Sequence, residues 1–225
     1  MASAGDAAVP PSPLAVATVP LGVEIPPEPP EVGARALHLA ARMLAGATTF
    51  FFLAYVFAYF YLRSLNVQGQ WHPTWVKPNE PLGAAIIVCV LVSAGLSYWS
   101  ARQMRQGNRG WVTTAGVALT LGLLVVVLQI IEWAVQGFGP TNGAYASVFI
   151  AWTSLYVLAV LGALYWLETQ VATELRARRS PAARGVGDIS NPDRLIAPGL
   201  DAAAFYWAYL AAVGAITYVL LYLIQ

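Results

Sequence analysis

The chain has 225 residues, of which 58% are hydrophobic and only 10% are charged. Soluble globular domains carry about 25% charged residues, so this composition excludes an ordinary soluble protein. The formal net charge of +1 gives no indication of a nucleic-acid partner. The single cysteine, Cys89, excludes an internal disulfide and a metal cluster held by cysteines alone.

Residues 1–31 contain eight of the fifteen prolines and neither lysine nor arginine. A secretory signal begins with basic residues and continues with an apolar stretch, which this segment lacks. Its composition predicts a flexible, Pro-rich cytoplasmic tail, followed by a transmembrane domain over 32–225.

Five apolar blocks follow the tail, and each is long enough to cross a bilayer, which takes about 20 helical residues. The chain lacks the alternating pattern of a membrane barrel, so we expect an all-α membrane protein that forms a bundle of five transmembrane helices. The polar segment 168–202 contains Pro181, Pro192 and Pro198 and is predicted to be a cytoplasmic loop. The predicted spans are 36–62, 82–101, 111–137, 144–167 and 203–224.

The distribution of lysine and arginine predicts the orientation, because these residues collect on the cytoplasmic side of membrane proteins. With five spans, ten of the twelve basic residues fall on the side of the N-terminus, and only Arg63 and Lys77 fall on the other. We therefore expect a cytoplasmic N-terminus and an outer C-terminus. The ten are Arg35, Arg42, Arg102, Arg105, Arg109, Arg176, Arg178, Arg179, Arg184 and Arg194.

Two further patterns predict how the spans pack. Clusters of small residues, which allow helices to approach closely, occur at 45–47 and 83–85, around Gly46 and Gly83. Tryptophans near the predicted span ends are typical of a belt at the membrane interface. These are Trp71, Trp75, Trp111, Trp133 and Trp207.

Gln129 and Glu132 interrupt an otherwise apolar span and share one face of its helix, because they are three residues apart. One interpretation is that this face borders a polar crevice, another subunit or lipid headgroups. The alternative is a hydrogen bond between helices that fixes their packing. A proton relay is disfavoured, because the chain has no other acid inside a predicted span.

The histidines do not predict a redox centre in this chain. Haem and copper sites need several imidazole or thiolate ligands. His38 lies at the cytoplasmic end of the first span and His72 lies in an outer loop, so the two are not expected to share a metal. We therefore predict that this chain has no catalytic centre, no metal site and no cofactor of its own.

Four stretches occur in the order and spacing of one known family. They are FFLAYVFAYFYLR (51–63), LTLGLLVVVLQIIEW (119–133), NGAYASVFIAWTS (142–154) and FYWAYLAAVGAITYVLLYL (205–223). Together they resemble subunit III of the haem-copper respiratory oxidases, the cytochrome c oxidase subunit 3 family, in its five-helix bacterial form. That form lacks the first two helices of the family, which usually make one side of a lipid cleft.

The chain departs from the family pattern at most intramembrane polar positions. Thr48 stands where the family usually has a glutamate, and Ser154 replaces a glycine. Two histidines are replaced by Tyr156 and Ala159, and the histidine and aspartate of the last helix by Ala208 and Ala211. Gln129 and Glu132 are kept, so the resemblance implies the family's scaffold more strongly than its proton or lipid roles.

The resemblance implies a non-catalytic subunit of a proton-translocating terminal oxidase in the bacterial cytoplasmic membrane. Its partners would be the haem-bearing catalytic subunit I, the copper-bearing subunit II and membrane phospholipids. Haem and copper would lie in those partners, and bound phospholipid is expected at this chain. The candidate lipid or subunit contacts are Glu132, Gln129, Trp133, Tyr59, Arg63 and Trp207.

Two alternatives remain open at this stage. A related accessory protein of a nitric-oxide reductase would share the family fold and would differ in its partner chain. A small transporter is less favoured, because the sequence has no inverted repeat, no pair of Gly- or Pro-broken spans and no set of charges near the midplane.

Overall fold

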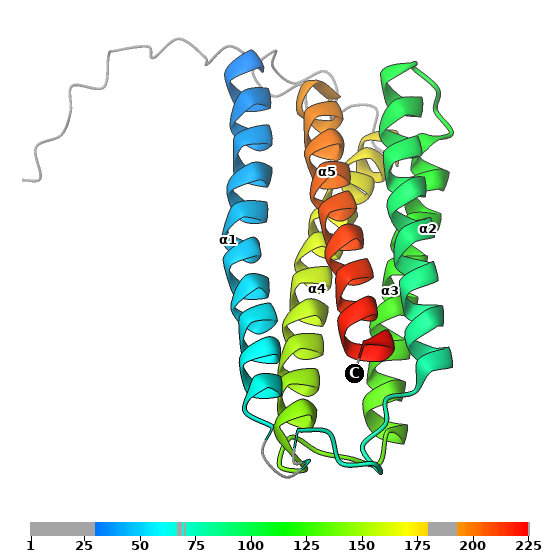
Figure 1. Ribbon diagram of the computed structural model, residues 1–225. Helices are drawn as coiled ribbons and strands as arrows, with labels where there is room; N and C mark the ends of the chain where they lie inside the picture. The colour runs from blue at the N-terminus through cyan, green and yellow to red at the C-terminus, as the bar shows by residue number, and fades with distance from the viewer. Residues whose placement is uncertain (1–29, 67–68, 70, 180–192, 225) are drawn as a thin grey trace, which may run out of the picture.

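The computed structural model describes residues 30–66, 69, 71–179 and 193–224. Within these residues the chain is helical, with no strand, which confirms the predicted all-α bundle (Figure 1). A short π-helical turn, η2 (Val219–Leu223), extends the last helix. The helices are α1 (Pro30–Ser64), α2 (Glu80–Arg105), α3 (Trp111–Val135), α4 (Ala144–Arg179) and α5 (Asp193–Tyr218).

Each of these five helices is long and apolar enough to cross a membrane. The shortest, α3, has 25 residues, which at about 1.5 Å per residue exceeds the roughly 30 Å of a hydrocarbon core. The helices α1 and α4, with 35 and 36 residues, are longer than a bilayer requires. The predicted number of spans is confirmed, and the protein is a multi-pass membrane protein.

The loop predicted over 168–202 is wrong in extent, because α4 continues to Arg179 and α5 begins at Asp193. The apolar block that predicted the fourth span ends near residue 167, but the helix continues beyond it. Leu167 and Val171 of α4 are buried with Ile196 and Leu200 of α5, so packing stabilises both extensions. Pro198, which falls within the predicted loop, lies inside α5.

The predicted tail also differs at its boundary, since α1 begins at Pro30. Residues 1–29 of that tail and residues 180–192 of the predicted loop lie outside the described residues.

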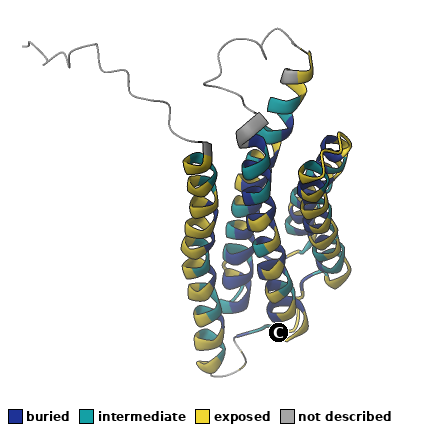
Figure 2. Cartoon of the chain, turned by 90° about the horizontal axis from the view of Figure 1, so that it is seen from above, coloured by how far each residue is buried: buried dark blue, intermediate teal, exposed yellow. Residues whose placement is uncertain are grey.

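The helices α4 and α5 occupy the middle of the bundle. The helix α1 packs on them from one side, while α2 and α3 form a pair on the other, with α2 against α5 and α3 against α4. Figure 2 shows this division in the burial of the helices, with most of α1 exposed and much of α4 and α5 buried. The face of α1 away from the bundle carries large apolar side chains, as a surface in contact with lipid does. These include Phe50, Phe57 and Phe60.

A chain of hydrogen bonds joins three helices in the middle of the bundle. The indole N–H of Trp207 donates to Ser93 Oγ at 2.9 Å, and the Ser93 hydroxyl donates to the Ala118 carbonyl at 2.7 Å. Gly122 makes room for this indole, because a Cβ there would overlap Leu164 and Trp207. The prediction that Trp207 belongs to an interfacial belt is therefore wrong. Its helix begins ten residues before the predicted span, which places Trp207 in mid-helix.

The turn between α2 and α3 is fixed by its backbone. The N–H of Gly107 donates to the Met104 carbonyl, and that of Asn108 donates to the Gln103 carbonyl, at 2.9 and 3.0 Å. This pair of bonds is a Schellman motif, which needs a left-handed residue at the first position beyond the helix cap. Gly107 has φ of 72°, so it meets that need without a steric penalty.

We predict that Gly107→Ala lowers the free energy of unfolding by about 1 kcal/mol, because alanine is strained at positive φ. The measurement is a denaturation curve in mixed detergent micelles. Gly95→Ala is the matched control, since a Cβ at this exposed helical position meets nothing within 4 Å. Equal losses in both variants would contradict the role given to the turn.

Candidate functional site

Glu132 lies on α3, one turn from its end, and its side chain is fully buried. Gln129 on the same helix donates through Nε2 to Glu132 Oε2 at 2.8 Å. The Tyr222 hydroxyl, 2.8 and 2.7 Å from Oε1 and Oε2, also donates to the carboxylate. Asn79, just before α2, adds a backbone hydrogen bond. Neither ion pair between described side chains involves Glu132, so hydrogen bonds satisfy this carboxylate.

The π-helical turn η2 carries Tyr222 at the end of the last helix. The N–H of Ile224 bonds the Val219 carbonyl five residues earlier, at 3.0 Å. Such wider turns leave carbonyl groups without their usual helical partner. The buried Tyr145 hydroxyl of α4 donates to one of these, the carbonyl of Leu221. Tyr145 and Glu132 thus attach η2 to α4 and α3, respectively.

Gly83 on α2 allows Tyr222 to reach the carboxylate, because a Cβ at this position would overlap the Tyr222 ring. The close contact predicted at 83–85 is confirmed here. The contact predicted around Gly46 is wrong, since a Cβ at Gly46 would meet nothing within 4 Å. A small cavity of about 20 Å³ adjoins Gln129 and Tyr222, which is room for about one water molecule.

The remaining candidate residues lie in separate contacts. Trp133 donates through its indole N–H to Thr153 Oγ1 at 3.0 Å, which joins α3 to α4. Arg63 donates to the buried Tyr59 hydroxyl at 3.2 Å, close to the end of α1. Trp207 lies in the middle of the bundle, away from both. Of the six candidates, Gln129 and Glu132 therefore form one hydrogen-bonded pair, and Tyr59 and Arg63 form a second, separate pair.

Burial divides the six candidates into two groups. Arg63 and Trp133 are partly exposed, whereas the other four, Tyr59, Gln129, Glu132 and Trp207, are buried inside this chain. The sequence leaves two interpretations of Glu132 open, a polar crevice or a hydrogen bond between helices. The geometry is that of the hydrogen bond between helices, because Tyr222 at the end of the last helix donates to Glu132 on α3. No local sequence pattern indicates its partner Tyr222, which is one of several aromatic residues in the last helix.

No group of three or more His, Cys, Asp or Glu side chains that could hold a metal ion occurs within the described part of the chain. His38 lies near the start of α1, while His72 follows the end of that helix. At about 1.5 Å per residue, roughly 40 Å of helix separates the His38 region from the end of α1.

His72 packs edge-on against the Tyr145 ring, with 4.5 Å between the ring centroids. Burial, followed by the positive charge of nearby Lys77, lowers the pKa of His72 below its usual value of 6.5. The neutral imidazole is therefore favoured in the folded chain.

Residues 32–184 match the family described as cytochrome c oxidase subunit III. The chain belongs to this family. It is 30% identical over 180 residues to "Cytochrome c oxidase subunit 3" of Tachyglossus aculeatus aculeatus, an alignment that covers 77% of this chain and 64% of that protein. The protein of the same description from Gallus gallus is 25% identical over 194 residues, which cover 84% of this chain and 69% of the relative.

The chain thus spans about 64% of the length of the first of these subunit III relatives. At positions where the sequence is expected to depart from the family's polar pattern, the side chains make contacts within the chain. Tyr156 donates to the Leu210 carbonyl at 3.0 Å, and Thr48 donates to the Leu44 carbonyl at 2.6 Å. Ala211 is buried in the apolar core. The hydrogen bonds of Glu132 join α3 to the end of the last helix, so this cluster is suited to fixing helices in place.

We predict that Tyr222→Phe lowers the free energy of unfolding by about 1–3 kcal/mol, because a buried carboxylate loses a donor. A denaturation curve in mixed micelles measures the change. Tyr165→Phe, on an exposed ring of α4, is the matched control and should change stability little. A loss in Tyr222→Phe no larger than in this control would remove the structural role of the Glu132 contact.

We predict that His72 makes the folded chain less stable in mild acid. The unfolded chain binds a proton near pH 6.5, whereas folded His72 does so only at lower pH. Its contribution therefore falls as the pH drops below 6.5 and becomes constant below the folded pKa. His72→Asn should lose less stability than the parent chain between about pH 7 and pH 5. His38→Asn, at an exposed ring, is the control, and an unchanged profile in His72→Asn would contradict the prediction.

Proposed function

We propose that this chain is a non-catalytic membrane subunit of a haem-copper terminal oxidase. It packs on the haem-bearing subunit I of a complex that also contains the copper-bearing subunit II. There it supports assembly, phospholipid binding and sustained proton-coupled reduction of oxygen. The observation that carries the proposal is the subunit III family match over residues 32–184 of a chain with five apolar helices.

The distribution of polar groups supports a role that depends on the outer surface of the bundle. The buried acid and its neighbours are engaged in contacts within the chain, as described for Gln129, Glu132 and Tyr222. The outward faces carry mainly apolar side chains, which suit lipid or another membrane helix. Among the candidate contacts, Arg63 and Trp133 are partly exposed and are proposed to touch lipid or a partner directly. The other four act by holding the helices that present this surface.

The proposed orientation of the chain in the membrane follows from the positions of its arginines. The starts of α1 and α5 and the ends of α2 and α4 lie at one end of the bundle (Figure 1). This end contains Arg102, Arg105 and Arg109, together with Arg176, Arg178 and Arg179. By the positive-inside rule it faces the cytoplasm of a bacterial inner membrane, and the Glu132 cluster lies toward the outer side.

The test is affinity purification of the tagged chain from its native membranes in mild detergent. We expect it to co-purify with a haem-bearing chain, to have no visible absorbance when dissociated, and to support oxygen consumption by the complex. Recovery without any haem-bearing chain would refute the proposal. A partner that reduces nitric oxide and not oxygen would favour the related reductase instead.

We predict that Glu132→Gln lowers the melting temperature or the phospholipid content of the purified complex. An amide cannot accept hydrogen bonds at both positions, so one of the buried donors around it loses its acceptor. The absorption spectrum of the haem should not change. Glu80→Gln, at an exposed position in the first turn of α2, is the control. A shifted haem spectrum in a complex of unchanged stability would contradict this account.

A further inference from the structure

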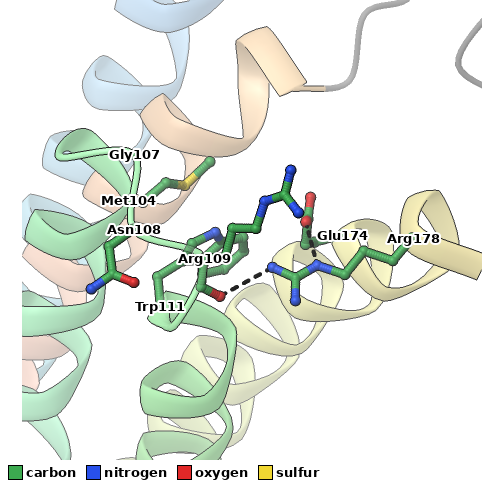
Figure 3. Close-up of a pocket in the computed structure, with 7 residues that line it drawn as sticks. All are labelled: Met104, Gly107, Asn108, Arg109, Trp111, Glu174 and Arg178. Atoms are coloured by element: carbon green, nitrogen blue, oxygen red, sulfur yellow. Dashed lines mark hydrogen bonds and ion pairs between the residues drawn. The ribbon is translucent and has the colours of Figure 1, made fainter.

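A pocket of about 430 Å³ lies at the arginine-rich end of the bundle, opposite the Glu132 cluster. The turn between α2 and α3 forms one wall and the last turns of α4 form the other (Figure 3). None of its residues belongs to the contacts discussed above for lipid or partner binding. It is lined by Met104, Gly107, Asn108, Arg109, Trp111, Glu174 and Arg178.

Two guanidinium groups and one carboxylate give this pocket a formal charge of +1. Arg178 donates through Nε to Glu174 Oε1 at 2.7 Å and through Nη2 to the Arg109 carbonyl at 3.1 Å. Figure 3 shows these three side chains gathered beside the turn. The two bonds use two of the five N–H groups of Arg178, so its guanidinium can still donate to a ligand.

The backbone of the turn fixes the position of Arg109. The Schellman motif at Gly107 ends α2, and Asn108 Oδ1 accepts the Gly110 N–H at 2.9 Å. The carbonyl of Arg109 in turn accepts a hydrogen bond from Arg178, which connects the turn to α4. The helix α3 then begins at Trp111 without a side-chain cap. The positive end of this helix adds to the attraction of the two guanidinium groups for an anion.

The place of the pocket in the membrane favours a lipid over a free anion. Trp111 is a buried indole at the first position of a membrane-spanning helix, where tryptophans lie at headgroup level. The helices that border the pocket expose apolar side chains beside which acyl chains can lie. Val117 on α3 is 48% exposed and Leu175 on α4 is 40% exposed. Basic pockets between transmembrane helices bind the phosphate of anionic lipids.

We infer that this pocket binds the phosphate headgroup of an anionic membrane phospholipid, with Arg109 and Arg178 as the phosphate ligands. The bound lipid adds to the Arg178 contacts and to the apolar packing of Trp111 with Val171, and so connects the α2–α3 turn to the end of α4. This inference requires only that the chain lies in a membrane, and it does not depend on which enzyme the chain assembles with.

The test is native mass spectrometry of the full chain in detergent, titrated with phosphatidylglycerol. We expect Arg109→Gln and Arg178→Gln each to weaken binding about fivefold, the ordinary effect of one basic residue near an anionic lipid surface. Arg176→Gln is the matched control, because Arg176 is exposed on the same turn of α4 and does not line the pocket. It should leave affinity within about twofold of the parent chain.

Two ligand controls separate the lipid from other sources of phosphate. Phosphatidylcholine, which has no net charge, should bind more weakly than phosphatidylglycerol, and inorganic phosphate should not displace bound lipid. Displacement by inorganic phosphate, equal losses in Arg109→Gln and Arg176→Gln, or no loss in either pocket variant would overturn the inference. Co-purification of the parent chain with a haem-bearing chain tests the proposed function separately.

Discussion

A carboxyl group buried inside an apolar bundle is costly unless its oxygens accept hydrogen bonds. In this chain that requirement is met by Gln129 and Tyr222, one from the same helix and one from the end of the chain. The hydrogen bond from Tyr222 constrains the end of the bundle that holds Glu132. It needs the π-helical turn η2, a glycine on α2 at Gly83 and the Tyr145 hydroxyl on α4. One buried acid thus determines how four helices meet.

The opposite end of the bundle is organised by charge at the membrane surface. There the Schellman turn, Arg109 and Arg178 join α2 and α3 to α4 through backbone and guanidinium contacts. Between the two ends, Trp207 and Ser93 join α5, α2 and α3. The polar groups therefore act at three levels along the helices, while apolar packing fills the space between them. The outer surface of the bundle carries mainly apolar side chains.

The family resemblance and the structure agree most closely where polar groups have been kept. Gln129 and Glu132, which the family motif contains, form the buried cluster. Where the family's polar residues are replaced, as at Tyr156 and Ala211, the structure has packing and backbone hydrogen bonds.

The sequence by itself determined the five spans and the helical class, because lipid demands long apolar helices and leaves few alternatives. It also carried the likeness to subunit III, through four stretches in the order and spacing of that family. It also located Gln129 and Glu132 on one face, because helical periodicity is local. It placed the start of α5 and the position of Trp207 wrongly, since the ends of a helix outside the apolar region depend on packing such as that of Leu167 and Ile196. The partner of Glu132 was decided only by the tertiary structure. Tyr222 lies 90 residues away along the chain, and its reach depends on a π-helical turn and on the missing side chain of Gly83, neither of which a local pattern encodes.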